Sequence, residues 1–410
     1  MIVKAGAVID ISGGWVRYQA GMVQTTRLIN ATGQVVDIAD ADPNDTYVGI
    51  YGGFTDVHSR WGVTETWASP ILSGAHYEGS YTEGRDAGSL TIKSSAVALD
   101  GTVYANSFPG ALQLQQAHVG TGTSGVYGDL RHVQGANSQL PAGGMLFLQA
   151  LGKTTDGLIT GGGDIRIVDV SSYPALGEIG YDQKAYIDAD GNLVTPPPQA
   201  QALPADRLGT IFLSDQALSQ MGLSQLSLHT SGAITDEAGT DLTLSPGGTF
   251  DALAGRTITV DGSVTAASGD IRLQTIVAGA GSVFNPTDAV VGSYDIVVNG
   301  SLSTRGQWVN DLGKAPDQIQ GSAWLDGGSI SIVSAARVAK YTQNATVSGT
   351  LSGDEPKVNT DLSGSILLNQ GSVIDVSGGG RVDVNGALDL SARGGDLSLI
   401  NDTTYFQIAT

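Results

Sequence analysis

One nine-residue unit near the start of the chain returns near its end. Residues 6–14 read GAVIDISGG, and residues 371–379 read GSVIDVSGG. Looser versions, in which a glycine and a small polar residue precede alternating β-branched or leucine residues, occur at 88–92, 163–167, 328–332 and 395–399. Short strands that repeat between glycine turns, without a helical period, are typical of β-solenoids. The pattern therefore predicts an all-β chain whose coils stack into a rod.

The glycine content agrees with this interpretation. The chain has 58 glycines among 410 residues, which is about twice the average usage. Each corner between stacked strands needs a positive φ or a close approach of two backbones, and glycine allows both. Coils of about 20 to 25 residues predict about fifteen coils or more. At about 4.8 Å per layer, the rod would be about 70 Å long.

We expect four segments along the chain. Residues 1–46 form one β-helix coil plus a hairpin, and residues 47–87 form an aromatic-rich excursion packed on the rod. Residues 88–205 form coils with long loops and a hairpin, and residues 206–410 form the most regular coils.

Several local patterns predict elements other than coils. The turn 31–34 lies between two apolar runs and predicts one hairpin, and Asp190-Gly191 predicts a second. Ser214 can cap a short helix over 215–221, which Gly222 would end. Residues 106–142, rich in Gly, Ser and Gln, predict a long loop.

The charge balance limits the choice of partners. The chain has 20 basic and 40 acidic residues and a net charge of −20. This field repels nucleic acid and anionic membrane surfaces, so we expect neither as a partner. The absence of cysteine excludes disulfides, thiolate metal sites and cysteine nucleophiles. It also suits a bacterial chain that crosses a membrane unfolded.

Titratable residues form no pattern that predicts catalysis. Four aspartates follow the first hairpin, but they depart from the calcium-loop pattern because Asp45 takes the place of the required glycine. They are Asp37, Asp40, Asp42 and Asp45. Asp188, Asp190 and Asn192 have calcium-like spacing, which the second hairpin explains. The five histidines are scattered. We therefore predict a chain that is not an enzyme, with no catalytic residue, cofactor or metal site; weak calcium binding stays open.

The aromatic segment holds the candidate ligand-binding residues, Trp61, Trp67 and Tyr77. A flat apolar ring with a polar edge suits both sugars and partner proteins. The alternative is that Trp61 and Trp67 anchor the excursion against the side of the rod, since an uncovered aromatic cluster favours aggregation.

The first 90 residues or so also carry motifs of a known family. They include SGGWVRY at 12–18, QTTRL at 24–28, ADPNDTY at 41–47, RWGVTET at 60–66 and YTEGRDAG at 81–88. With these motifs the chain resembles the filamentous haemagglutinin family of large bacterial exoproteins, of the two-partner-secretion type. The resemblance implies a right-handed parallel β-helix, secreted from or displayed on the outer-membrane surface of a Gram-negative bacterium. It also implies an outer-membrane transporter as the partner during export.

These observations lead to one leading hypothesis and two alternatives. The leading hypothesis is a structural and adhesive rod segment that attaches to a glycan or protein on a host or neighbouring cell. The family's N-terminal secretion domain is not found, and both ends look cut, so we expect an internal fragment. The alternatives are a carbohydrate-active β-helix, either polysaccharide lyase or hydrolase, and an extracellular filament subunit that associates end to end.

Overall fold

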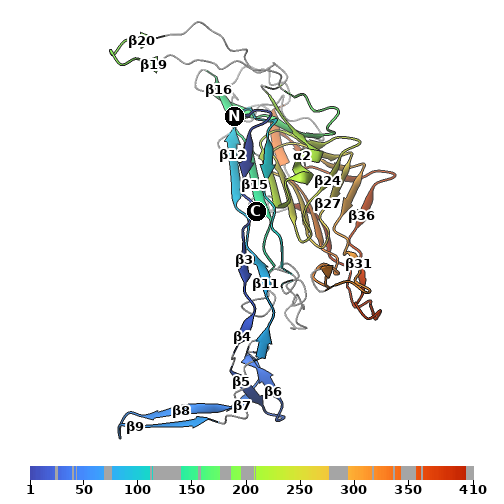
Figure 1. Ribbon diagram of the computed structural model, residues 1–410. Coiled ribbons are helices and arrows are strands. Elements are labelled where there is room, and N and C mark those ends of the chain that lie inside the picture. The colour runs from blue at the N-terminus through green and yellow to red at the C-terminus, as the bar shows by residue number, and fades with distance from the viewer. Residues whose placement is uncertain are drawn as a thin grey trace.

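Strands dominate the part of the chain that the structure describes. The computed structural model describes residues 1–23, 26–38, 41–42, 44–68, 76–110, 113, 140–155, 158–175, 186–194, 207, 209–276, 294–315, 318–335, 338–342, 357–361 and 363–402. Figure 1 shows a layered body of strands and a long, narrow ribbon of strands that projects from it. The all-β class predicted from the sequence is confirmed, and the largest sheets are parallel.

Three parallel sheets build the body. The first contains β12 (Ser89–Ser94), β15 (Gly144–Ala150), β22 (Leu223–Thr230), β25 (Thr249–Ala254), β28 (Asp270–Thr275), β32 (Ser329–Ala335) and β39 (Leu397–Asp402). The second contains β21 (Thr210–Ser214), β18 (Asp164–Val168), β23 (Ile234–Asp236), β26 (Ile258–Val260), β29 (Ile296–Val298) and β35 (Ile366–Leu368). The third contains β24 (Asp241–Thr243), β27 (Ser263–Thr265), β30 (Ser301–Ser303) and β36 (Val373–Asp375). From β22 to β30 the chain visits the three sheets in turn, so three consecutive strands form one layer.

The core consists of apolar side chains that stack from layer to layer. In the first sheet, Leu226, Phe250 and Ile271 are register partners, and so are Leu228, Ala252 and Leu273. All six side chains are buried. Because neighbouring residues of a strand point to opposite faces, the alternating pattern sends every second side chain inward. Each fully buried Leu or Ile contributes about 1.5–3 kcal/mol.

A column of glycines explains the repeated glycine before each strand of the first sheet. A Cβ atom on Gly328 would lie 1.8 Å from the carbonyl oxygen of Gly269, and one on Gly395 would lie 1.7 Å from that of Gly328. No side chain fits at these distances. The glycines of the repeat are therefore required by the close approach of successive layers.

The helix α2 (Asp215–Gln220) takes the place of a strand beside β24. Ser214 caps it, and Gly222 follows it with a φ of 73°, as the sequence predicted. Two side chains of α2 accept hydrogen bonds from backbone N–H groups at the edge of β24. Asp215 accepts from the N–H of Asp241 at 2.9 Å, and Ser219 accepts from the N–H of Thr243 at 2.9 Å.

The described residues between Trp15 and Gly84 form a series of antiparallel strand pairs, here called the arm. Its strands are β3 (Trp15–Tyr18), β4 (Gly21–Val23), β5 (Arg27–Asn30), β6 (Val35–Asp37), β7 (Tyr47–Tyr51), β8 (Gly53–His58), β9 (Val63–Ala68), β10 (His76–Glu78) and β11 (Tyr81–Gly84). β3 pairs with β11, β4 with β10, β5 with β6 and β7, and β8 with β9, all antiparallel. In Figure 1 the arm runs away from the body, and β8 and β9 lie at its far end.

The arm differs from the expected division at residue 46. The hairpin expected around 31–34 is present as β5 and β6, but it belongs to the same ribbon as the aromatic segment. The excursion begins at Trp15 and projects from the body instead of packing on it. The cause is the pairing of β3 with β11, two strands that lie far apart in the sequence.

The remaining strands pair at the start of the body or in insertions. β1 (Ile2–Val3) pairs with β13 (Ala98–Leu99), and β2 (Val8–Asp10) pairs with β14 (Thr102–Tyr104). Insertions contain β16 (Gly152–Thr155) with β17 (Leu158–Gly162), β19 (Tyr186–Ile187) with β20 (Leu193–Val194), β33 (Val338–Thr342) with β34 (Lys357–Asp361), and β31 (Trp308–Asn310) with β37 (Gly380–Val382) and β38 (Leu388–Asp389). The hairpin predicted at Asp190-Gly191 is confirmed.

The arm and the insertions make the body shorter than predicted. The longest sheet has seven strands among the described residues, so the estimate of about fifteen coils was too high. The estimate counted residues as coils that instead form the antiparallel strands of the arm and the insertions. Most of the predicted loop 106–142 lies outside the described residues.

One buried arginine fastens β21, which joins its sheet out of chain order. Arg207 is 1 % exposed, and its guanidinium donates to the carbonyl oxygen of Pro174 at 2.5 Å. It lies 3.8 Å from the carboxylate of Asp100, which also accepts from the hydroxyl of Tyr173 at 2.8 Å. The group ties the start of β21 to an earlier layer of the body.

Asp236 is a carboxylate inside the core. It is 2 % exposed and lies in register between Ile167 and Val260, and its Oδ1 atom accepts from the Thr240 hydroxyl at 2.5 Å. The Oδ2 atom has no hydrogen-bond partner among the described residues. Burial raises the pKa of Asp236 to about 7.

We expect the stability of the protein to fall as the pH rises from about 4 to about 7. In this window the folded state keeps the Asp236 proton, because its pKa is about 7, while the unfolded state has lost it. Asp236→Asn removes this titration, so the variant should be more stable than the wild type at pH 8, by up to about 4 kcal/mol, and equal to it near pH 4. Denaturant unfolding at both pH values measures the difference; equal stability at pH 8 would contradict the assignment.

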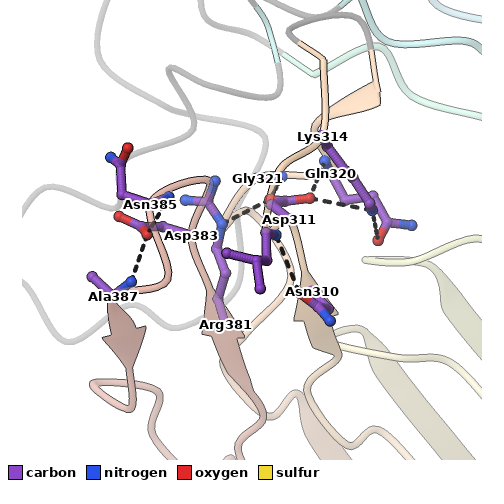
Figure 2. A network of polar contacts seen from close by, with 10 residues as sticks. Asn310, Asp311, Lys314, Gln320, Gly321, Arg381, Asp383, Asn385 and Ala387 are labelled. Atoms are coloured by element: carbon purple, nitrogen blue, oxygen red, sulfur yellow. Dashed lines mark hydrogen bonds and ion pairs between the residues drawn. The ribbon is translucent and has the colours of Figure 1, made fainter.

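Asp311 is a second buried carboxylate, with partners on both oxygens (Figure 2). Oδ1 accepts from the N–H of Gln320 at 3.0 Å and lies 3.3 Å from the Lys314 ammonium. Oδ2 accepts from the N–H of Gly321 at 3.1 Å and from Nε of Arg381 at 2.8 Å. Burial alone would raise the pKa of Asp311, but these hydrogen bonds outweigh it and lower the pKa below its ordinary value.

Asp311→Ala should open the loop that carries Gln320 and Gly321, because their N–H groups and the Arg381 guanidinium lose their acceptor. We expect a loss of about 3 kcal/mol and faster hydrogen exchange at both amides. Asp383→Ala is the matched control, since Asp383 accepts from two backbone N–H groups at 2.9 and 2.7 Å in its own turn; its cost should be nearer 1 kcal/mol.

The wild type should also lose the contribution of Asp311 in acid. A lowered pKa means that this contribution is present above about pH 4, where the unfolded carboxyl ionises, and disappears as the pH falls through the folded value. Equal acid sensitivity of the wild type and Asp311→Asn would contradict the assigned role.

Candidate recognition surface

The arm exposes aromatic residues because it has only two or three strands at any point. β3 and β11 pair with Trp15 opposite Gly84, Arg17 opposite Thr82, and Tyr18 opposite Tyr81. Aromatic and β-branched residues favour such extended strands. At the base of the arm, Phe108 and Gln113 pack against Gly84. Among the other described residues of the arm, most side chains meet solvent or their cross-strand neighbours.

The far end of the arm is the hairpin of β8 and β9. The N–H of Trp61 donates to the carbonyl oxygen of His58 at 2.9 Å, and Gly62 has a φ of 63°, which only glycine adopts without strain. These two features turn the chain tightly. They leave the Trp61 side chain 74 % exposed at the tip.

The His58 ring lies beside this tryptophan, and two carboxylates lie beside His58. The His58 ring lies 5.8 Å from the Trp61 ring, centre to centre, and its Nε2 atom lies 3.4 Å from Asp56 and 4.0 Å from Glu65. The tip therefore presents an apolar ring beside hydrogen-bonding groups. This combination binds sugar rings or polar protein surfaces.

The structure does not gather the three predicted ligand residues at one place. Trp61 lies at the tip, and Trp67 lies further along β9, paired with Phe54 of β8. Tyr77 lies on β10 beside Met22 and is 69 % exposed. The expectation that Trp61 anchors the excursion on the rod is wrong, because the arm carries it away from the body. His58, Asp56 and Glu65 were missed, and a hairpin prediction around Arg60–Gly62 would have placed them beside Trp61.

The predicted turn roles of the acidic clusters hold where the structure describes them. Asp188 accepts from the N–H groups of Asp190 and Asn192 at 3.0 and 2.8 Å, as a hairpin turn requires. Asp42 accepts from the N–H of Asn44 at 2.8 Å, while Asp40 lies outside the described residues. Within the described ranges, no group of acidic, histidine or cysteine residues is arranged to hold a metal ion.

The histidines are also separated in the described part of the chain. His229 lies on the outer face of the first sheet, 3.1 Å from the carboxylate of Asp251 and edge-on to the ring of Phe147. His118 and His132 lie outside the described residues. His58 is the histidine that contributes to the tip.

In comparisons with protein-family models, curated proteins and solved structures, no match to this chain was found. Among the described residues, no helix is long and apolar enough to cross a membrane. The geometry of the chain is therefore the basis of the functional proposal.

Proposed function

We propose that the chain is a structural and adhesive segment of a large exoprotein similar to the filamentous haemagglutinins. The body would be a right-handed parallel β-helix, secreted from or displayed on a Gram-negative cell and exported by an outer-membrane transporter. Three observations support this proposal: the regular return of the chain to three parallel sheets from β22 to β30, the register between layers, and the glycine column.

The exposed tip of the arm carries the adhesive part of the proposal. A contact residue must reach another surface before the body does. The β8–β9 hairpin, whose turn contains Trp61, lies at the end of the arm farthest from the body (Figure 1). Exposed tryptophans are common among the residues that dominate binding energy. The ligand would be a glycan or protein on a host or neighbouring cell.

We expect Trp61→Ala to weaken attachment of the protein to cell surfaces by about tenfold or more, because a central tryptophan contributes about 2 kcal/mol or more to binding. Binding of labelled protein to intact cells measures this. Trp308→Ala is the matched control, since Trp308 is 62 % exposed but lies on β31, outside the arm. Unchanged attachment of Trp61→Ala would contradict the role of the tip.

The same preparations test the enzymatic alternative and the fold. If the protein releases products from a panel of polysaccharides, the proposal of an adhesive segment gives way to that of a lyase or hydrolase. Electron microscopy should show a short column with a thin projection, and a uniformly compact particle would remove the β-helix proposal.

One observation favours the filament subunit as a second candidate. The repeated nonamer supplies β2 and β36, and both are edge strands in their sheets. Val8 and Val373, at the same position of the two copies, are both exposed. An edge of one chain could continue the ladder at the other edge of the next.

If this pairing forms, the measured mass should rise with protein concentration, and Val373→Lys should abolish the rise by placing a charge at the junction. Analytical ultracentrifugation measures the mass. A constant monomer mass at high concentration would exclude this candidate.

A further inference from the structure

The ribbon formed by β3 and β11 has two chemically different faces. Successive residues alternate between faces, so Val16, Tyr18, Tyr81 and Glu83 share one face. On this face the side chains find partners nearby. The rings of Tyr18 and Tyr81 stack with their centres 4.7 Å apart, and the Glu83 carboxylate forms an ion pair with Arg85 at 3.1 Å.

The opposite face carries Trp15, Arg17 and Gln19 from one side of the ribbon, with Thr82 across from Arg17. Trp15 lies opposite Gly84, and there the face is covered by the backbone of Phe108, whose carbonyl oxygen would lie 1.9 Å from a Cβ atom on Gly84. Trp15 itself remains 64 % exposed. This face, here called the Trp15 face, has the composition of a binding surface.

Two polar side chains of the Trp15 face, Arg17 and Gln19, have no partner in the part of the chain that the structure describes. Among the described residues, the side chains of Arg17 and Gln19 make no hydrogen bond and no ion pair. Glu83 of β11 lies on the other face and is paired with Arg85. Within the described ranges Arg17 is therefore a cation without an acidic partner, although the chain has twice as many acidic as basic residues.

A shallow hollow of about 460 Å³ lies on this face, lined by Trp15, Arg17, Gln19, Ala20 and Ser80. Each lining group suits one part of an acidic sugar. An indole packs against the apolar face of a pyranose ring. A guanidinium binds a planar carboxylate with two parallel hydrogen bonds. The amide of Gln19 and the hydroxyl of Ser80 can each donate to and accept from sugar hydroxyls.

We propose that the Trp15 face binds a carboxylate-bearing sugar, as found in polyuronate chains. The site lies at the base of the arm and is separate from the Trp61 tip (Figure 1). It stands without the adhesive proposal, because it needs only the β3–β11 ribbon. The proposal for the Trp15 face specifies an acidic sugar as ligand, whereas the proposal for the Trp61 tip covers any glycan or protein.

The charge of the whole chain argues for a uronate rather than a heavily sulfated polymer. A net charge of −20 repels any polyanion, and the repulsion grows with the charge density of the polymer. A single arginine fork can offset one carboxylate, and the indole supplies attraction that does not depend on charge. Binding should therefore need both residues together.

Binding of the full chain to polygalacturonate, measured by calorimetry or biolayer interferometry, tests the proposal. We expect saturable binding that Trp15→Ala and Arg17→Gln each weaken by about tenfold or more, and that free galacturonate oligosaccharides compete away. Arg17→Lys should recover only part of the affinity, because an ammonium lacks the fork geometry. Trp308→Ala should bind like the wild type.

Neutral dextran and dextran sulfate separate the competing explanations. The proposal predicts weak binding to both. It is overturned if the wild type does not bind polygalacturonate, if Trp15→Ala binds it normally, or if dextran sulfate binds more tightly and loses affinity only with salt. Because Trp15 and Arg17 are exposed, unchanged melting temperatures of the variants would show that the losses are local. Cell attachment through Trp61 can persist or fail independently of this result.

Discussion

Backbone hydrogen bonding between successive layers is the constraint on which the body depends. The spacing of hydrogen-bonded strands is about 4.8 Å, so every layer must place similar groups at the same position as its neighbours. Apolar residues meet apolar residues inside, as in the column of Leu226, Phe250 and Ile271. At the corners, Asn369 donates to Asn299 at 2.6 Å, and Asn299 donates to Asp261 at 2.5 Å. Where two backbones approach most closely, only glycine fits.

The two buried aspartates show how the same environment can favour opposite charge states. Asp236 lies between apolar register partners with one hydroxyl donor, so desolvation dominates and its pKa rises. Asp311 receives two N–H groups and two cationic side chains, which outweigh desolvation and lower its pKa. The number of hydrogen-bond donors around a buried carboxyl, and not burial alone, therefore decides whether its pKa is raised or lowered. The first aspartate weakens its layer above neutral pH, whereas the second fastens a loop.

The arm follows a different rule from the body. It has no core, so its strands are held by cross-strand pairing and by local contacts such as the Tyr18–Tyr81 stack. At the base of the arm, the side chains of one face contact each other, whereas Trp15 and Arg17 on the other face are exposed. Both proposed contact sites depend on tryptophans, Trp61 and Trp15, that the arm leaves largely exposed.

From the amino-acid sequence alone, the all-β class, the glycine-marked repeats, the hairpins at 31–34 and Asp190-Gly191 and the helix capped by Ser214 could be predicted. These features depend on residues close together in the chain, whose alternation and turn chemistry are visible in the printed letters. The pairing of β3 with β11, the number of layers and the environments of Asp236 and Asp311 came only from the tertiary structure. Each of them depends on partners many residues apart, and periodicity shows which side of a strand is apolar but not which distant strand will lie beside it.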